Sequence, residues 1–267
     1  MKRAYLGCLA AAVAVTAVMQ MPSASTVAFA QKPATAGPPA AQANFNCQGL
    51  PPAAELRRLM NEASDDSIGG LFNGARMWAA VVNRGGEICA YATSTADPTQ
   101  VWPGSQAIAK AKAYTANAFS LDVLALSTAR LYTFTQPGHS LWSLGQSNLF
   151  NANLLLAPGE SGDKNQIAGG LIFFGGGVPL YVNGKIVGGL GISGDTSCAD
   201  HEIAKLVRNL AGLNPPGGML VDDIIYSGPD EPSVFAHPVC LNTKRNGVAI
   251  GSEAPATYPY VPAPPQN

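Results

Sequence analysis

The chain has 267 residues, of which 47% are hydrophobic and 12% charged, and its 16 basic and 17 acidic side chains give a formal net charge of -1. This composition excludes a disordered chain. The near-zero charge gives no electrostatic basis for binding nucleic acid or an anionic membrane surface. We therefore expect a globular protein of one large domain or two small ones.

The first thirty residues have the features of an export signal. Lys2 and Arg3 form a basic start, a short apolar run follows, and Ala28 and Ala30 place small residues at a cleavage position. An apolar run of this length, followed by a cleavage site, favours a removed leader over a membrane-spanning anchor. We expect a periplasmic or secreted protein without a membrane anchor after cleavage.

Changes in composition divide the chain after this leader. The expected parts are a Pro- and Ala-rich linker (31–46), one domain (47–213), a loop-rich C-terminal extension (214–251) and a Pro-rich tail (252–267). The run 215–218, Pro-Pro-Gly-Gly, opens the extension. Prolines in the tail prevent a helix there and limit sheet hydrogen bonds.

Hydrophobic periodicity and turn residues predict the elements of the domain. In chain order, we expect a helix (51–64), two strands joined by a turn (75–82 and 87–93), a helix (105–120), a short helix (within 124–131), a hairpin (178–187) and a helix (197–211). Asn183-Gly184 is the preferred type I′ hairpin turn, because both central residues need positive φ. Strands joined by hairpins imply an α+β fold, an antiparallel sheet with packed helices, rather than a wound parallel sheet.

The ends and faces of the predicted helices follow from particular residues. Ser105 and Ser197 are the expected N-cap residues, because a serine hydroxyl can accept a hydrogen bond from a free backbone N–H. The last helix is expected to turn its apolar stripe toward the core: Ile203, Leu206, Val207 and Leu210.

Four cysteines remain after the leader, an even number in an oxidising compartment, so we expect two disulfides. Three pairings are possible, and the pairing of Cys47 with Cys89 and Cys198 with Cys240 closes the shortest loops. An alternative is a tetrahedral zinc site, with the ligands Cys198, His201, His237 and Cys240. Exported thiols tend to oxidise, which favours the disulfides.

Gly189, Gly191 and Gly194 have the spacing of a dinucleotide-binding loop. We reject that function, because the strand belongs to an antiparallel hairpin and no acidic residue ends a following strand. The glycines are expected where neighbouring backbones pack closely. Motifs for hydrolase, metalloprotease or nucleotide chemistry are missing from the sequence, as is C-x-x-C-H, so covalent haem attachment is excluded and a non-catalytic protein is favoured.

The three histidines limit any imidazole chemistry. His201 lies in the first turn of a helix and is expected at the solvated surface, and His237 precedes a proline in the extension. His139 lies in a turn within an aromatic segment, and such loops often hold functional residues. His139 is therefore a candidate ligand, with a loop residue of no special role as the alternative.

The glycine-rich stretch 169–194, followed by Asp200-His-Glu-Ile-Ala204, resembles the signature of the GlcG/HbpS-like family. Residues 109–119 resemble the family's first conserved helix, and the resemblance covers roughly 53–212. It implies a profilin-like or PAS-like sandwich, symmetric oligomers, and binding of haem or, in some relatives, a corrinoid. The chain departs from the family pattern in residues 121–166, in its four mature cysteines and in its C-terminal extension.

This resemblance also implies where the tetrapyrrole binds. It places the second helix at the site, with Thr115 as the hydroxyl nearest the iron. Propionate partners and slot walls are then sought nearby: Lys110 and Lys112 for the propionates, and Phe119, Trp142 and Phe150 for the walls. An ordinary solvated face for the lysines and a core role for the aromatics are the alternatives.

The function that we expect is non-covalent haem binding by an exported carrier, scavenger or sensor component. An enzyme acting on a small molecule or on haem at the same pocket is one alternative, and an oligomeric assembly module is another. A homo-oligomer is predicted, because the glycine-rich hairpin is too apolar and too poor in charge to face water on both sides.

Overall fold

The computed structural model describes residues 45–148, 166–167 and 169–252. The predicted leader, nearly all of the linker and of the tail, and Phe150 lie outside these residues. Within the described part of the chain, every helix is too short or too polar to cross a bilayer.

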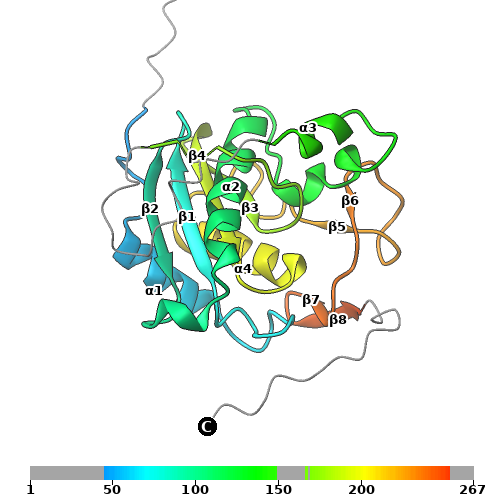
Figure 1. Ribbon diagram of the computed structural model, residues 1–267, viewed down its shortest axis with the longest axis horizontal. Coiled ribbons are helices and arrows are strands. Elements are labelled where there is room, and N and C mark those ends of the chain that lie inside the picture. The colour runs from blue at the N-terminus through cyan, green and yellow to red at the C-terminus, as the bar shows by residue number, and fades with distance from the viewer. Residues whose placement is uncertain (1–44, 149–165, 168, 253–267) are drawn as a thin grey trace, which may run out of the picture. The chain divides into compact units, whose positions relative to one another are not determined.

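The centre of the fold is a four-stranded antiparallel sheet with the strand order β2-β1-β4-β3 (Figure 1). Its strands are β1 (Trp78–Asn83), β2 (Ile88–Thr93), β3 (Gly177–Val182) and β4 (Lys185–Ser193). Both predicted hairpins are confirmed, with β1 paired to β2 and β3 paired to β4. Asn183 and Gly184 have φ values of 50° and 75°, as a type I′ turn requires.

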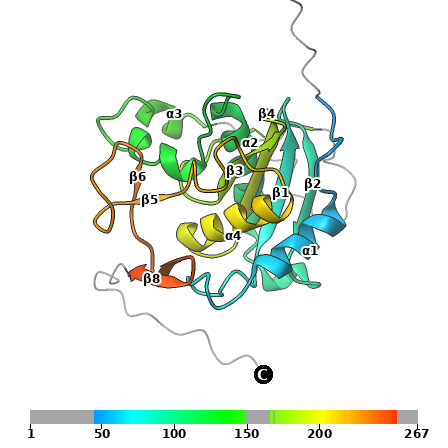
Figure 2. The ribbon, with the colours of Figure 1, turned by 180° about the vertical axis from the view of Figure 1, so that it is seen from behind.

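Helices cover both faces of this sheet. Helix α2 (Gly104–Phe119) lies on one face, and helices α1 (Ala53–Ala63) and α4 (Ser197–Leu210) lie on the other (Figures 1 and 2). The alternation of β1 explains the two layers, because Ala79 and Val81 pack toward α1 and α4 while Ala80 and Val82 pack toward α2. The predicted α+β fold is therefore confirmed.

The glycines of β4 allow α2 to approach the sheet very closely. A Cβ atom on Gly189 would lie 2.2 Å from the carbonyl oxygen of Ala113, and one on Gly191 would lie 2.0 Å from that of Ala109. These contacts explain the G-x-G-x-x-G spacing by backbone packing, as expected from the sequence.

The two helical layers also change the argument for oligomers. The strands β3 and β4 are buried within one chain except at their turn end, since α2 covers one face of the hairpin and α4 the other. The apolar character of the hairpin therefore has an explanation inside the monomer. The homo-oligomer stays a prediction that needs other support.

Several helix ends differ from the prediction. Helix α2 begins at Gly104 without a side-chain cap, so Ser105 is not its N-cap. Thr196, rather than Ser197, caps α4, and its hydroxyl accepts a hydrogen bond from the backbone N–H of Ala199. Leu210 is exposed rather than inward, because it belongs to the last turn of α4.

The connections between these elements contain shorter pieces of helix. The short helix predicted within 124–131 is a 3₁₀ helix at Thr128–Leu131, and further 3₁₀ turns lie at Pro98–Gln100 and Thr133–Thr135. A five-residue helix, α3 (Trp142–Gln146), follows the turn that contains His139.

The residues after α4, which we call the C-terminal segment (214–252), pack against this helix. They contain two short strand pairs: β5 (Ile225–Tyr226) with β6 (Ala236–His237), and β7 (Thr243–Arg245) with β8 (Val248–Gly251). Disulfides join Cys47 to Cys89 and Cys198 to Cys240, which confirms the predicted pairing. The second disulfide ties the C-terminal segment to the start of α4.

Candidate functional site

A stretch of chain that we call the strap (169–176) covers the side of α2 that carries the predicted tetrapyrrole ligands. Thr115 is fully buried beneath it. The Thr115 hydroxyl donates to the carbonyl of Ala111 at 2.7 Å and accepts from the backbone N–H of Ile172 at 3.0 Å. An incoming iron could therefore reach this hydroxyl only after the strap hydrogen bond had opened.

Lys112 lies on the same side of α2 and is also fully buried. Its ammonium donates to the Asp200 carboxylate at 2.7 Å and to the carbonyl of Ile192 at 2.9 Å, and it lies 4.8 Å from the ring centre of Phe174. Burial lowers the pKa of Lys112 and raises that of Asp200 to about 6. Lys112 thus links α2 to α4, and in this arrangement it is not accessible to a propionate.

The other predicted tetrapyrrole contacts differ in exposure. The half-buried Phe119 packs edge-to-face on Phe173 of the strap, with ring centres 6.0 Å apart. Lys110 is buried, 4.2 Å from the ring centre of Tyr91, so neither lysine lies on a solvated face. Trp142 is partly exposed at the start of α3.

His139 is exposed in its turn, where its backbone N–H donates to the carbonyl of Gln136. All three histidines of the chain lie in the described residues, and the other two, His201 and His237, are each only 1% exposed. His139 is therefore the single imidazole that a ligand arriving from solvent meets. In the described residues, no hydrogen bond or ring contact joins it to Thr115 or Phe119.

A buried group of charged side chains lies between α4 and the C-terminal segment. The Lys205 ammonium contacts Glu202 at 2.9 Å and Asp223 at 3.2 Å. His201 Nε2 lies 3.2 Å from Asp223 Oδ1, although the ring is not aligned for a hydrogen bond. The expectation of a solvated His201 is therefore wrong, because the C-terminal segment covers this face of the helix.

The charge on Asp223 is stabilised by this group. Burial would raise the pKa of its carboxyl, but the adjacent His201 imidazole and Lys205 ammonium lower it well below the usual value. One turn further along α4, Arg208 forms a two-point ion pair with Asp222 at 2.6 and 2.8 Å, and both side chains are buried. These pairs attach the C-terminal segment to α4.

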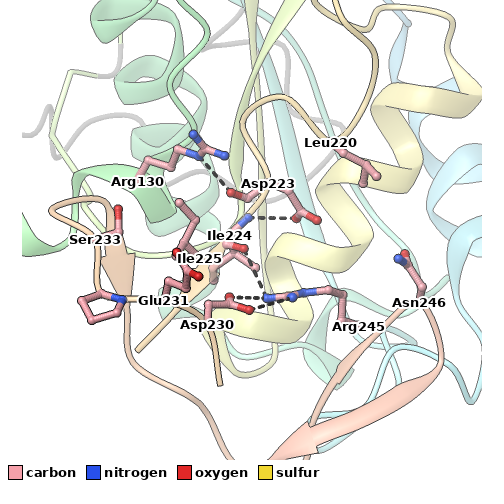
Figure 3. Close-up of a pocket in the computed structure, with 11 residues that line it drawn as sticks. Arg130, Leu220, Asp223, Ile224, Ile225, Asp230, Glu231, Ser233, Arg245 and Asn246 are labelled. Carbon is pink, nitrogen blue, oxygen red and sulfur yellow. Dashed lines mark hydrogen bonds and ion pairs between the residues drawn. The ribbon is translucent and has the colours of Figure 1, made fainter. Parts of the chain in front are cut away.

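A pocket of about 500 Å³ opens beside this charged group (Figure 3). The Arg130 side chain lies on one side, where its Nε donates to the carbonyl of Asp223. On another side, Arg245 makes a two-point ion pair with Asp230, and its guanidinium lies 5.0 Å from the ring centre of Tyr226. The lining mixes both signs of charge, so it favours neither an anion nor a cation.

Sequence reasoning missed this pocket. Its walls come from three separate stretches, the 3₁₀ helix at Thr128–Leu131, residues 220–233 and the end of β7. Only the packing of the C-terminal segment brings these stretches together, and the local sequence of each contains no common motif that could have indicated the pocket.

The start of α4 holds a second cluster around the disulfide of Cys198 and Cys240. His237 Nδ1 donates to the carbonyl of Pro238 at 2.7 Å, which leaves Nε2 to accept from the backbone N–H of Gly175 at 3.2 Å. Burial lowers the pKa of His237 to about 4, so its ring is neutral at neutral pH.

Three of the four residues considered for zinc lie together in this cluster. The ligand atoms of Cys198, His237 and Cys240 all lie within 4.8 Å of one another. The fourth, His201, points instead to Asp223. In this structure the two cysteine sulfurs are bonded to each other, so neither is present as a thiolate.

The comparisons with known proteins identify a relationship for the central part of the chain. A family model described as "Haem degrading protein HbpS-like" matches residues 54–208. The match begins in α1 and ends in α4, so it includes α2, the strap and the glycine-rich hairpin. It leaves His237, Cys240 and most lining residues of the pocket outside. No curated protein matches the chain significantly.

Solved structures give distant matches. A Klebsiella pneumoniae protein called ORFY is 21% identical, with a TM-score of 0.41, and the match covers 60% of this chain and 83% of that one. A PduOC:heme complex is 24% identical, with a TM-score of 0.41 and coverage of 58% and 88%. A double mutant of Streptomyces reticuli HbpS is 20% identical, with a TM-score of 0.40 and coverage of 59% and 82%.

Proposed function

This chain belongs to the HbpS-like family, and on that basis we propose that it binds haem, or a related tetrapyrrole such as a corrinoid, without a covalent bond. The observation that carries the proposal is the match of the family model over residues 54–208. This range contains α2, the strap and the turn with His139, and so includes the expected contacts Thr115, Lys112, Phe119 and His139.

The residues expected at the site differ in how well they could contact a haem. A haem needs an apolar slot and at least one axial donor to its iron. Phe119 and Phe173 offer apolar surface beside α2, and His139 offers an exposed imidazole. Thr115 is fully buried and its hydroxyl already makes two hydrogen bonds, so we assign the axial donor to His139 and keep Thr115 as the alternative.

A single exposed imidazole suits a haem that must be released again. One axial donor on a surface turn holds the iron less firmly than two donors in a closed slot would. This favours a carrier, scavenger or sensor component over a protein that keeps its haem permanently. The N-terminal leader expected from the sequence would place that function in the periplasm or outside the cell.

A haem titration followed by ultraviolet-visible spectroscopy tests the proposal. We expect a Soret band that saturates with added haem, and we expect His139→Ala to shift the band and weaken binding about tenfold. Added imidazole should restore the wild-type spectrum of this variant. Thr115→Val keeps the shape of the side chain and serves as the matched control, with an unchanged spectrum.

Two other outcomes would change the assignment. If Thr115→Val alters the spectrum while His139→Ala does not, the iron is bound at α2 and the strap must open. If the purified chain gives no saturable Soret band, haem binding itself is wrong and the assembly-module function becomes the better explanation.

Oxidative degradation of haem is a second candidate function, favoured because the matching family is described as haem-degrading. It would use the same site, with an external electron donor and dioxygen as co-reactants. The test is the Soret band of the haem complex after both are added. Loss of the band together with release of iron, faster than for free haem, would support an enzyme, and a stable band would exclude it.

We also infer self-association, now on different grounds from those of the sequence. Apolar side chains are exposed beside the turn between β3 and β4: Leu121, Val123, Leu124 and Val182. Light scattering at micromolar concentration tests this, because a mass equal to that of one chain would contradict a homo-oligomer.

A further inference from the structure

The cluster at the start of α4 contains the atoms of a metal site, closed by a disulfide. Cys198 lies in the first turn of the helix and is fully buried, whereas Cys240 is partly exposed. The backbone N–H of Cys198 donates to Cys240 Sγ at 3.2 Å, and Ser197 Oγ lies 3.3 Å from the same sulfur. If Cys240 were reduced, the N–H of Cys198 and the hydroxyl of Ser197 would both stabilise its thiolate.

The other disulfide provides a comparison within the same chain. Both bridges join cysteines 42 residues apart. Cys89 Sγ has the carbonyl of Glu87 as its neighbour, and among the described residues only the cluster at Cys198 brings a third metal-ligating side chain within reach. Because the two loops have equal lengths, loop length does not distinguish the two disulfides. They differ in the side chains that surround them.

We propose that the Cys198–Cys240 disulfide is reducible in the folded protein, and that its reduction creates a binding site for a thiolate-binding divalent cation such as Zn²⁺. The ligands are the sulfurs of Cys198 and Cys240 and the Nε2 atom of His237. The family match ends before His237 and Cys240, so this site does not follow from the family assignment.

The reduction needs an external dithiol, which supplies the two electrons. A thiolate of the dithiol attacks Cys240 Sγ, the more exposed sulfur, and Cys198 leaves as a thiolate in the first turn of α4, where the helix dipole stabilises it. The second thiol of the reagent then attacks the mixed disulfide and releases Cys240. Two electrons pass to the protein, and the dithiol becomes a cyclic disulfide.

The geometry around His237 suits a metal ligand. Zinc binds sulfur at about 2.3 Å and imidazole nitrogen at about 2.0–2.1 Å. Ligand atoms at these distances from one tetrahedral ion are less than 4.8 Å apart, and the three ligand atoms here already lie within 4.8 Å of one another. The hydrogen bond from Nδ1 to the carbonyl of Pro238 leaves the lone pair on Nε2, an outer-shell arrangement common for zinc-binding histidines. Zinc binding at Nε2 would replace the hydrogen bonds of this atom with the backbone N–H of Gly175 and with Ser197 Oγ.

The charge and the remaining coordination position are also suitable. Two thiolates and a neutral imidazole around a divalent cation form a neutral group, which a largely buried site can hold without an unpaired charge. Ser197 Oγ lies 3.4 Å from His237 Nε2, next to the fourth position, where it or a water molecule completes the tetrahedron.

The experiment isolates this bridge by removing the other one. The full chain carrying Cys47→Ser and Cys89→Ser is treated with dithiothreitol without oxygen, supplied with Zn²⁺ and freed of excess metal and reagent by gel filtration. We expect one zinc per chain after reduction and none before it. Co²⁺ in place of Zn²⁺ should give thiolate-to-metal charge-transfer absorption and the intense visible bands of a tetrahedral site.

Matched variants identify the ligands. His237→Ala should weaken zinc binding by more than the roughly 10- to 100-fold caused by loss of an outer-shell partner. His201→Ala removes a buried histidine of α4, the helix that carries Cys198, and should leave zinc binding unchanged. The chain in which Cys198→Ser and Cys240→Ser are added to Cys47→Ser and Cys89→Ser should bind no zinc under the same conditions.

Several results would overturn the proposal. They are zinc bound equally by the oxidised chain, zinc absent from the reduced chain, or unchanged affinity in His237→Ala. If His237→Ala does not fold, X-ray absorption of the cobalt-loaded parent decides the matter, because the proposal requires two sulfur ligands and at least one imidazole. Failure here leaves the haem titration unaffected.

Discussion

Helices α2 and α4 pack on opposite faces of one sheet, but they are held in different ways. Helix α2 approaches β4 through backbone atoms that fill the space beside Gly189 and Gly191. Helix α4 also packs an apolar stripe on the sheet, yet its other side buries ionisable side chains: His201, Glu202, Lys205 and Arg208. The partners of these side chains come largely from the C-terminal segment.

The difference teaches that two helices of one small protein can lose stability for opposite reasons. A close backbone contact is sensitive to added volume, since the interior has no room for another methyl group. A buried ion pair is sensitive to the removal of one partner, since the other charge is left without compensation. Four predictions follow from this distinction, each tested by a variant and its control.

The largest effect is expected for Asp222→Ala. It leaves the buried Arg208 guanidinium without its carboxylate, and such a loss costs about 3–5 kcal/mol in the free energy of unfolding. Urea unfolding measures it. The double variant Arg208→Met with Asp222→Leu should recover much of this loss, because no uncompensated charge remains. Equal losses in the single and double variants would contradict the importance of charge pairing.

Removal of the disulfide between α4 and the C-terminal segment should have the next largest effect. Replacing Cys198 and Cys240 by serine should cost about 2–4 kcal/mol. The matched variant replaces Cys47 and Cys89, and its loop has the same length, so the loop-entropy part should be equal. Hydrogen exchange within 214–252 should increase only in the first variant. An increase in both would mean that the C-terminal segment is not held locally.

Gly191→Ala tests the other helix. The new Cβ would lie 2.0 Å from the carbonyl oxygen of Ala109 and 2.5 Å from the backbone nitrogen of Ala113, so α2 must move away from the sheet. We expect a loss of about 1–3 kcal/mol, measured by thermal or urea unfolding. Gly104→Ala, where a Cβ meets no atom within 4 Å, is the control and should be neutral or slightly stabilising.

The smallest effect is a pH dependence centred on Asp223. Its pKa is lower in the folded chain than its usual value of 3.8, so the unfolded state binds the proton more readily. The stability that it contributes is therefore present above pH 3.8 and is lost as the pH falls below that value. Asp223→Asn should be about 1 kcal/mol less stable at neutral pH, and the difference should shrink in acid. A constant difference between pH 7 and 2.5 would contradict this.

The elements with local signals could be predicted from the sequence. The Asn183-Gly184 turn, the hairpin of β1 and β2, and the apolar stripe of α1 are each encoded within a few residues, and the structure places them as expected. The disulfide pairing in the structure is the one that the sequence analysis favoured because it closes the shortest loops. The close packing of Gly189 and Gly191 also followed from the antiparallel hairpin.

The environment of charged side chains could not be predicted, because it depends on segments distant in sequence. Lys112 meets Asp200 across 88 residues, and Arg208 meets Asp222 only where the C-terminal segment folds back. A helical pattern alone gives His201 a polar face, although that face is covered. The strap over Thr115 was hidden for the same reason, since its residues carry no regular pattern.

The unequal exposure of the three histidines has a practical consequence for solution studies. A reagent that acylates imidazole should modify one histidine per folded chain, His139, and reach His201 and His237 only after unfolding. Mass spectrometry of the labelled chain would then report the accessibility of this one turn. A bound haem that uses His139 would protect it, so the same label would measure how fast the haem leaves.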